Sequence, residues 1–273
     1  MNLMLVNLGC GSRYHKAWTN IDFLKSGPDV IQHDLRSGIP LKADSADVVY
    51  HSHVLEHFSR QDGLTFLRNC FRILKPGGFI RVVVPDLETI ISEYLLQMKS
   101  AKEGNIEAAA RYDWILLELF DQAVRNFSGG DMLGHWKRNP IPAEEYIIER
   151  LGSEVKNALK EIRSQSVVSD KQYSPTILSR IIARSKRYCL RILGYTHEMA
   201  EIGKFRKSGE IHYWMYDEYS LKRALLEAGF VNPSRRAADQ SAIADFNSYS
   251  LDTEIDGSVR KPDSLFVEAM KPL

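Results

Sequence analysis

Five short apolar runs in the first 85 residues, each followed by glycine or polar residues, constrain the fold more than any other feature. The runs cover residues 3–8, 19–23, 29–34, 46–50 and 79–84. Between the last two runs, apolar residues recur at helical spacing from Leu64 to Leu74, and residues 75–78 (KPGG) end that helix. Strands that alternate with loops or helices indicate a parallel sheet with crossover connections. The sequence therefore predicts an α/β fold with a doubly wound, mostly parallel sheet.

The same alternation returns near the C-terminus. Asp217 is expected to cap a helix that Gly229 ends, and residues 264–270 are expected to form a last, antiparallel strand at the closing edge of the sheet. The intervening segment reads as helical, with an apolar face after Pro142 formed by Ile147, Leu151, Val155, Leu159 and Ile162. We expect residues 1–87 and 213–273 to form the core domain, and residues 88–212 to form an inserted helical cap.

Composition excludes several classes of protein. The chain has 273 residues, 44% apolar and 26% charged, and its net charge of +1 does not support wholesale nucleic-acid binding. No apolar run approaches the roughly 20 residues that span a bilayer, and the first residues lack the features of a signal peptide. Cys10, Cys70 and Cys189 are too widely spaced for a disulfide or zinc framework. We expect a cytoplasmic protein.

The first strand breaks into a glycine turn, Gly9-Cys10-Gly11. Glycine lets the backbone turn sharply and approach a ligand that a Cβ would obstruct. In open α/β sheets the ligand lies beyond the carboxyl ends of the strands, where Asp22, Asp34 and residues 51–53 also fall. The alternative for either aspartate is an ordinary turn or N-cap residue.

The gap between the turn and the next acidic residue is unusually short. Asp22 follows Gly11 by eleven positions, against about 20 in dinucleotide-binding folds. Residues 12–18 therefore have room only for a turn or a helical stub, so we expect Arg13, Tyr14 and His15 to cover the ligand. A nicotinamide dinucleotide is disfavoured, because its pyrophosphate needs a helix N-terminus at this place.

The order of these motifs resembles the class I S-adenosylmethionine-dependent methyltransferases, and within them a poorly characterised branch of small bacterial enzymes. The resemblance covers about the first third of the chain, with a further motif at 212–217. It rests on residues 7–11 (NLGCG), 20–22 (NID), 33–35 (HDL), 47–57 (DVVYHSHVLEH), 74–78 (LKPGG), 84–86 (VPD) and 212–217 (HYWMYD). Two positions depart from the family pattern: Asn7 replaces its usual acidic residue, and Arg13 replaces its third glycine.

The resemblance implies S-adenosylmethionine as cofactor. Backbone at the glycine turn would face the methionine portion, Asp22 would accept hydrogen bonds from the ribose hydroxyls, and Asp34 would meet the adenine amino group. The full set of expected cofactor residues is Asn7, Gly9, Cys10, Gly11, Arg13, Tyr14, Asp22, Asp34, Leu35, His51 and Ser52.

Methyl transfer needs an aligned acceptor and, for a hydroxyl, a base that removes its proton. The candidate bases are His53, His57, Asp86 and His212. Histidine suits this role because its unperturbed pKa is near neutrality, although each of these histidines could instead be a structural residue.

Two other chemistries remain open. Residues 53–57 match the HxxEH spacing of inverted zinc peptidases, but the strand before His53 is the wrong context for two histidines on one helical turn. A milder hypothesis has His53, Glu56 and His57 hold a divalent metal beside the acceptor, and we assign no metal ligand. Asn7 and the short first crossover support a further alternative, a non-catalytic cofactor-binding regulatory protein.

The cap is expected to select the acceptor, a small molecule or a saccharide. Residues 121–132 form a polar, glycine-containing break between helices, and Trp136 and Trp214 could stack on a sugar or an aromatic ring. From Lys171 to His197 there are six Lys or Arg and no acidic residue among apolar ones. This stretch is either a solvated helix face or a peripheral contact with an anionic membrane.

Overall fold

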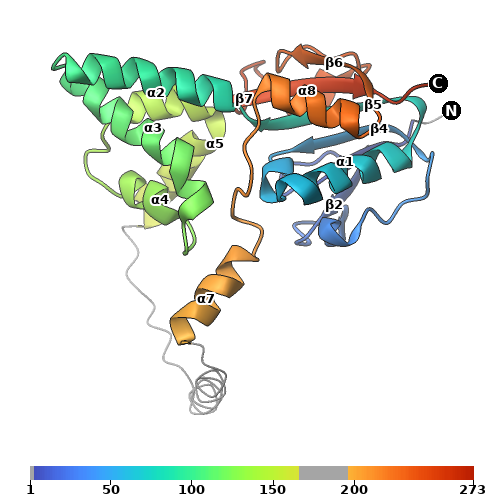
Figure 1. Ribbon diagram of the computed structural model, residues 1–273, viewed down its shortest axis with the longest axis horizontal. Helices are drawn as coiled ribbons and strands as arrows, with labels where there is room; N and C mark the ends of the chain where they lie inside the picture. The colour runs from blue at the N-terminus through green and yellow to red at the C-terminus, as the bar shows by residue number, and fades with distance from the viewer. Residues whose placement is uncertain (1–2, 166–195) are drawn as a thin grey trace.

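A computed structural model describes residues 3–165 and 196–273 (Figure 1). Its centre is one seven-stranded sheet in the order β3-β2-β1-β4-β5-β7-β6. Strands β1 to β5 are parallel, and β7 is antiparallel to both of its neighbours. The strands are β1 (Leu5–Leu8), β2 (Thr19–Asp22), β3 (Val30–Gln32), β4 (Ala46–Ser52), β5 (Leu74–Pro85), β6 (Val231–Arg236) and β7 (Ser264–Met270). The predicted fold class, a mostly parallel α/β sheet, is confirmed.

The C-terminal edge of the sheet differs from the prediction. Strand β7 does not close the sheet, because β6 pairs with it on the outside. The apolar pattern does not predict β6, whose residues (VNPSRR) are mostly polar. Pro233 lacks a backbone N–H, and such a residue is tolerated on an edge strand.

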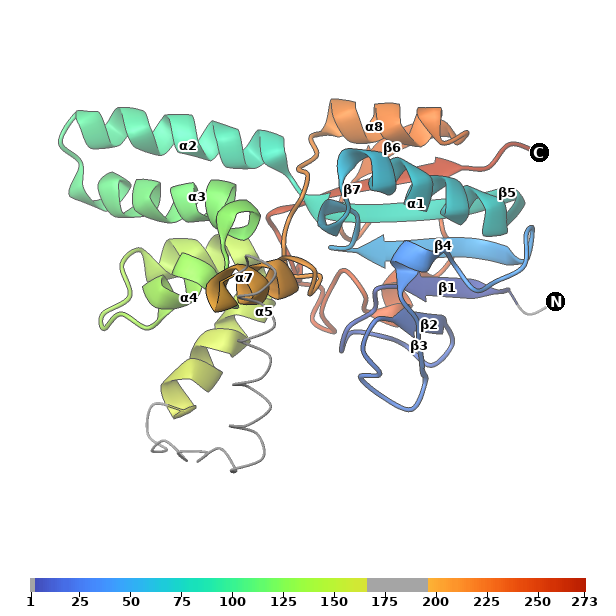
Figure 2. The ribbon, with the colours of Figure 1, turned by 60° about the horizontal axis from the view of Figure 1, so that its bottom comes forward.

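One face of the sheet is covered by two helices, α1 (Arg60–Ile73) and α8 (Glu218–Glu227) (Figure 2). Ser59 caps α1, and Asp217 caps α8 in a reciprocal capping box with Ser220, as the sequence predicts for Asp217. The apolar side chains of both helices pack against alternate residues of β1, β4, β5 and β7. They form the largest hydrophobic core of the protein.

The opposite face is covered without a long helix. Residues 9–18, all of which the structure describes, contain only turns, as the eleven-position gap predicts. Residues 237–263 fold back over this face instead, and Trp18 and Phe246 pack there against Tyr50. The guanidinium of Arg81, 0% exposed in β5, binds Asp252 at 2.7 Å and three backbone carbonyls of this segment. Hydrogen bonds from Arg81 to residues distant in the sequence therefore hold this segment on a face that no long helix covers.

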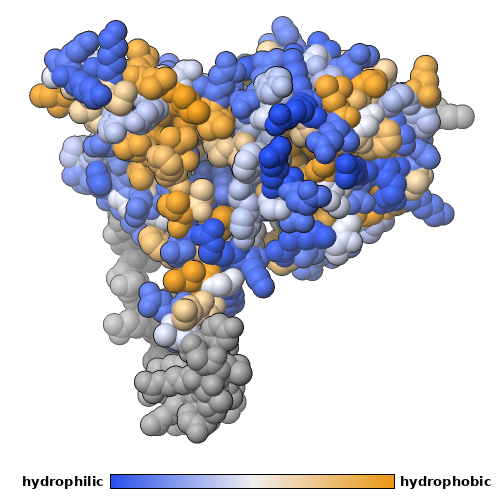
Figure 3. Space-filling view, viewed as in Figure 1, coloured by the Kyte–Doolittle hydropathy of each residue, from blue (hydrophilic) through white to orange (hydrophobic). Residues whose placement is uncertain are grey.

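A lobe of helices lies beyond the carboxyl ends of the parallel strands (Figure 1). We call α2 to α5 the helical lobe; they are α2 (Leu87–Lys102), α3 (Ile106–Val124), α4 (Gly130–Trp136) and α5 (Glu144–Gln165). The lobe has its own core around Trp114, Ile147 and Leu159. Figure 3 shows apolar side chains exposed over α2 and α3, where Leu95 and Phe120 are about half exposed.

The helical lobe follows β5 directly in the chain, and contacts at α5 and after α7 also join it to the core. Helix α5 is kinked at Gly152 (φ 73°), and the kink lies against the backbone of Arg260. Next to it, Glu154 binds Lys261 at 3.0 Å. After α7 (His197–Arg206), the chain returns to the sheet, and His212 N donates to Gln122 O of α3 while Tyr213 N donates to Glu56 O of the core. Residues 212 and 213 thus bind the lobe and the core at once.

None of the described helices is both long enough and apolar enough to cross a membrane. Most of the basic segment at 171–197 lies outside the described residues.

We expect Gly152→Ala to destabilise the protein. The new Cβ would lie 2.3 Å from the Arg260 carbonyl oxygen, at a φ that L-residues rarely adopt. Such strain costs about 1–3 kcal/mol, which urea denaturation would detect.

Gly134→Ala is the matched control for this prediction. Gly134 lies within helix α4, and outside the backbone of that helix a new Cβ would meet no atom within 4 Å. This substitution should leave stability unchanged or slightly raised. Equal midpoints for the two variants would show that the kink does not depend on glycine.

Candidate functional site

Three cavities open at the carboxyl edge of the sheet. The main cavity, about 690 Å³, lies between the glycine turn and the start of α1. The loop cavity, about 210 Å³, lies on the other side of the turn, against residues 260 and 261. The lobe cavity, about 310 Å³, lies between the sheet edge and helices α3 to α5. His53 lines all three cavities.

The glycine turn is shaped by two positive φ angles, 64° at Gly9 and 53° at Gly11. A Cβ on Gly9 would lie 2.3 Å from Val54 Cγ2, so only glycine fits there. A Cβ on Gly11 would meet no atom within 4 Å. The backbone at Gly11 therefore borders open space that a bound molecule can approach closely.

Two aspartates line the main cavity, and they differ in their partners. Asp22 accepts hydrogen bonds from Gly11 N and Leu24 N, both at 2.8 Å, and each carboxylate oxygen keeps capacity for another donor. Asp34 is held by the Arg36 side chain in an ion pair of 2.9 Å. The hydrogen bond from Arg36 lowers the pKa of Asp34.

The residues after the glycine turn bind other parts of the chain. Arg13 lines the loop cavity and donates to Ser250 O and to the Glu254 carboxylate, both at 2.8 Å. His15 packs edge-on against Tyr249, and the Tyr14 ring lies against Gly27. Neither Tyr14 nor His15 lines any of the three cavities.

Asn7 and Cys10, both uncharged, also line the loop cavity. Asn7 is buried and donates to Asn20 Oδ1 at 3.2 Å. Burial raises the pKa of the Cys10 thiol to about 12, so this thiol stays protonated.

His53 is the side chain at which the three cavities meet. It follows the end of β4 with a left-handed φ of 54°, uncommon for a residue other than glycine. Its Nε2 lies 2.9 Å from Ser264 Oγ, and its Nδ1 lies 3.2 Å from Glu56 Oε1. A proton on Nδ1, facing the carboxylate, leaves Nε2 free to accept a second proton.

The HxxEH spacing does not produce the helical arrangement of an inverted zinc peptidase. His53 lies before the short 3₁₀ turn of Leu55–His57 and not on one helical turn with His57. The group that could hold a metal is instead Glu56, His57 and His212, whose ligand atoms all lie within 4.8 Å of one another. His212, from the distant end of the sequence, takes the place that the sequence hypothesis gave to His53.

The remaining predicted residues are dispersed. Leu35 lines the main cavity, and Ser52 lines the loop cavity. Asp86 is buried, caps α2 and pairs with Arg235 at 2.8 Å, so its carboxylate is engaged away from the three cavities. His51 is 0% exposed against Phe66 and also lines none of them. Three of the four candidate bases, His53, His57 and His212, therefore lie around Glu56, and Asp86 lies apart from them. Only His53 reaches all three cavities.

The lobe cavity contains residues that the sequence did not single out. Glu118, Glu154, Lys261 and Asp263 bring charge to a wall that also carries apolar side chains. Of the residues expected to contact an acceptor, Gln122, Met132 and Trp136 line this cavity. Trp214 instead lies at a separate surface hollow, under Arg60. No local motif marks the charged residues, because they meet only when the lobe packs on the sheet.

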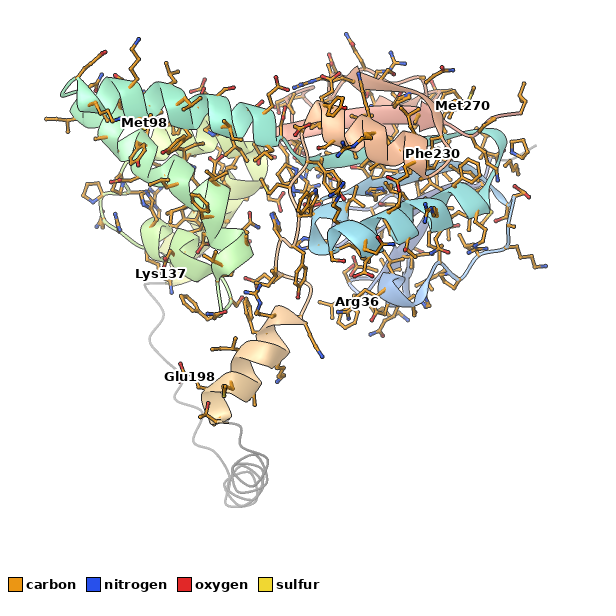
Figure 4. All side chains as sticks on the ribbon, in the orientation of Figure 1. Arg36, Met98, Lys137, Glu198, Phe230 and Met270 are labelled. Carbon is orange, nitrogen blue, oxygen red and sulfur yellow. The ribbon has the colours of Figure 1, made fainter. Side chains whose placement is uncertain are left out.

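The C-terminal end of α7 borders the main cavity. Arg206, Lys207 and Tyr213 line it, and the Arg36 guanidinium donates to Lys207 O at 3.1 Å. Figure 4 shows Arg36 at the edge of the core, close to this end of α7. The main cavity is thus bounded by the sheet and by the segment that leaves α7.

Comparison with known proteins identifies the type of domain. A family model described as a methyltransferase domain matches residues 7–82, which contain the glycine turn, Asp22, Asp34 and His53. No curated protein matches the sequence.

Solved structures of methyltransferases give a weaker likeness. A possible histamine N-methyltransferase from Thermotoga maritima is 11% identical over 98% of this chain and 82% of its own, with a TM-score of 0.40. A SAM-dependent methyltransferase from Archaeoglobus fulgidus is 11% identical over 98% of this chain and 86% of its own, with a TM-score of 0.38. These scores lie below 0.5, so the domain type rests on the family match.

The buried His51 predicts a loss of stability in acid. Burial lowers the pKa of His51 to about 4, whereas in the unfolded chain it is near 6.5. Between pH 6.5 and pH 4 the unfolded chain therefore binds more protons than the folded protein does. The free energy of unfolding should therefore fall as the pH drops, by up to about 1.4 kcal/mol per unit from this residue.

His51→Leu tests this expectation in urea denaturations at pH 7.5 and pH 5. Both imidazole nitrogens lack a hydrogen-bond partner among the described residues, so the variant should be no less stable at pH 7.5. It should also lose less stability at pH 5 than the wild type does. His197→Ala, at an exposed site on α7, should keep the wild-type acid slope. An acid slope unchanged in His51→Leu would contradict the assignment.

Proposed function

We propose that this chain, in which residues 7–82 match a methyltransferase domain, is a class I S-adenosylmethionine-dependent methyltransferase. In this proposal it methylates a hydroxyl or amino group of a small-molecule or glycan-type acceptor, with His53 as general base. The observation that carries this proposal is the position of His53, which lines the main, loop and lobe cavities together. A base at that junction can face a methyl donor on one side and an acceptor on the other.

The residues at the sheet edge fit the cofactor. The main cavity is within the range of about 300–1,000 Å³ that small-molecule sites occupy. Open space in front of Gly11 allows close approach to the backbone, and Asp22 retains acceptor capacity for two ribose hydroxyls. In the proposed pose Gly9 and Gly11 face the methionine portion and Asp22 holds the ribose. The adenine then lies towards Asp34 and Leu35.

When bound, the cofactor would supply an electrophilic methyl group, whose S–CH₃ bond would break as the acceptor O–CH₃ or N–CH₃ bond forms, with the electron pair left on sulfur. The chain must align the acceptor and remove its proton. Glu56 orients the His53 ring through Nδ1, and Nε2 receives the acceptor proton. Ser264 Oγ lies 2.9 Å from Nε2, so in the proposed complex the acceptor group takes the place of this hydrogen bond.

The lobe cavity is the proposed acceptor site. Glu154 and Asp263 offer carboxylates that can accept hydrogen bonds from hydroxyl or amino groups, and Trp136 and Met132 offer apolar surface. The Glu118 carboxylate is already held by Arg150 at 2.6 Å. Such a mixture suits a polyhydroxylated ring better than an extended apolar molecule. In this proposal the helical lobe acts as a cap that selects the acceptor.

His53→Gln tests the general base. We expect kcat to fall by about 10²–10⁴, because a positioned base contributes that factor to proton transfer. S-adenosylmethionine affinity, measured by calorimetry, should change little. The measurement is formation of S-adenosylhomocysteine with a panel of sugars, hydroxylated aromatics and amines.

His197→Gln, at an exposed position of α7, is the matched control and should keep full activity. A general base also gives an acid limb in the kcat–pH profile, which His53→Gln should lose. If His53→Gln keeps the wild-type kcat and profile, another group removes the proton.

Asp22→Ala tests the cofactor pose. Losing the carboxylate removes the hydrogen bond to Gly11 N and both proposed ribose contacts, so we expect S-adenosylmethionine to bind at least tenfold more weakly by calorimetry, about 1.4 kcal/mol or more. Asp29→Ala, an exposed aspartate in the following loop, should bind the cofactor as the wild type does. Equal affinities for the two variants would exclude the pose.

A further inference from the structure

A buried carboxylate lies between two imidazoles beside the proposed base. Glu56 is 0% exposed, and neither of its oxygens has an aligned hydrogen-bond partner among the described residues. His57 comes from the same 3₁₀ turn, and His212 comes from the segment that joins the lobe to the core. One ligand atom from each of the three residues lies within 4.8 Å of the other two.

Glu56 forms no ion pair with a Lys or Arg among the described residues. Its neighbour is the His53 ring, whose Nδ1 lies 3.2 Å from Glu56 Oε1. Both carboxylate oxygens are fully buried and keep capacity to bind a further partner. A buried carboxylate without hydrogen bonds or a counter-charge costs several kcal/mol.

Both imidazoles are already oriented by hydrogen bonds. His57 Nδ1 lies 3.0 Å from Ile211 O, and as the donor to this carbonyl it leaves the lone pair on Nε2. His212 Nε2 lies 3.0 Å from the Gln122 side-chain amide. A half-turn of that amide places Oε1 there to accept the Nε2 proton, and Nδ1 then keeps its lone pair for a metal. A hydrogen bond on one ring nitrogen is the usual way in which proteins fix a histidine that binds a metal.

We propose that Glu56, His57 and His212 form a binding site for a divalent transition-metal ion, with Zn²⁺ as the preferred occupant. Two neutral imidazoles and one carboxylate suit Zn²⁺, whereas Mg²⁺ and Ca²⁺ prefer sets of oxygen ligands. An ion here would supply the charge that Glu56 lacks. Three protein ligands leave a coordination position open, as in catalytic zinc sites.

The proposed ligands come from both sides of the junction between core and lobe. Glu56 and His57 belong to the core, whereas His212 N donates a hydrogen bond to Gln122 O of the lobe. Metal binding would therefore tie the segment at residues 211–213 to the core. The set excludes His53 but shares Glu56 with the proposed base, because His53 Nδ1 lies 3.2 Å from Glu56 Oε1.

Metal titration of the full chain tests the proposal. Protein stripped with a chelator should bind about one Zn²⁺ per chain by calorimetry, and Co²⁺ should give the visible absorption of a bound ion. Glu56→Gln and His212→Ala should each weaken Zn²⁺ binding by at least tenfold. His197→Ala, which removes an exposed imidazole outside the cluster, should bind Zn²⁺ as the wild type does.

Folding and methyl transfer are separated from metal binding by two further measurements. Without metal, Glu56→Gln should unfold at about the same urea concentration as the wild type, because glutamine keeps the size and shape of the side chain. This readout shows that a loss of zinc affinity does not reflect a misfolded chain. S-adenosylmethionine binding by the stripped wild type reports on the cofactor site alone.

Absence of Zn²⁺ and Co²⁺ binding by the wild type would overturn the proposal. So would affinity that persists in both Glu56→Gln and His212→Ala.

Discussion

The fully buried guanidinium of Arg81 holds the segment at 237–263 on the face of the sheet that no long helix covers. It binds Asp252 and Glu268, at 2.7 and 2.8 Å, and lies over the ring of Phe246. These contacts fix the segment at 237–263 on the face that Trp18 and Tyr50 present. Removing one partner of such a network leaves a buried charge unpaired, which costs about 3–5 kcal/mol. The short first crossover is possible because this segment covers the face instead of a helix.

The same segment supports the site. Arg13, which follows the glycine turn, binds Ser250 O and Glu254, so the turn is held by the segment that Arg81 fixes. Lys261, near the end of this segment, binds Glu154 of the helical lobe. The position of the lobe relative to the glycine turn thus depends on side chains that are remote from the proposed chemistry. We infer that acceptor geometry is set by these connections as much as by the cavity walls.

Local sequence patterns predicted most of the sheet correctly. The five parallel strands and the cap of α8 are confirmed because apolar runs and capping residues act within a few positions of the chain. The sequence did not predict strand β6, because this edge strand is held by hydrogen bonds to β7 and does not need an apolar pattern. The position of β7 inside the sheet was missed for the same reason.

The order of glycine turn, Asp22, Asp34 and the histidine-rich end of β4 was enough to indicate the cofactor and the class of reaction. These residues follow successive strands, and parallel strands bring their carboxyl ends to one edge. Sequence order could not separate the histidines, which lie within seven positions of one another apart from His212. The tertiary structure separates them: His51 lies in the core and His53 lines the cavities. His57 contacts His212, which lies about 150 residues further along the chain. Contacts between such distant segments follow from how the lobe packs on the sheet, a property that no local pattern encodes.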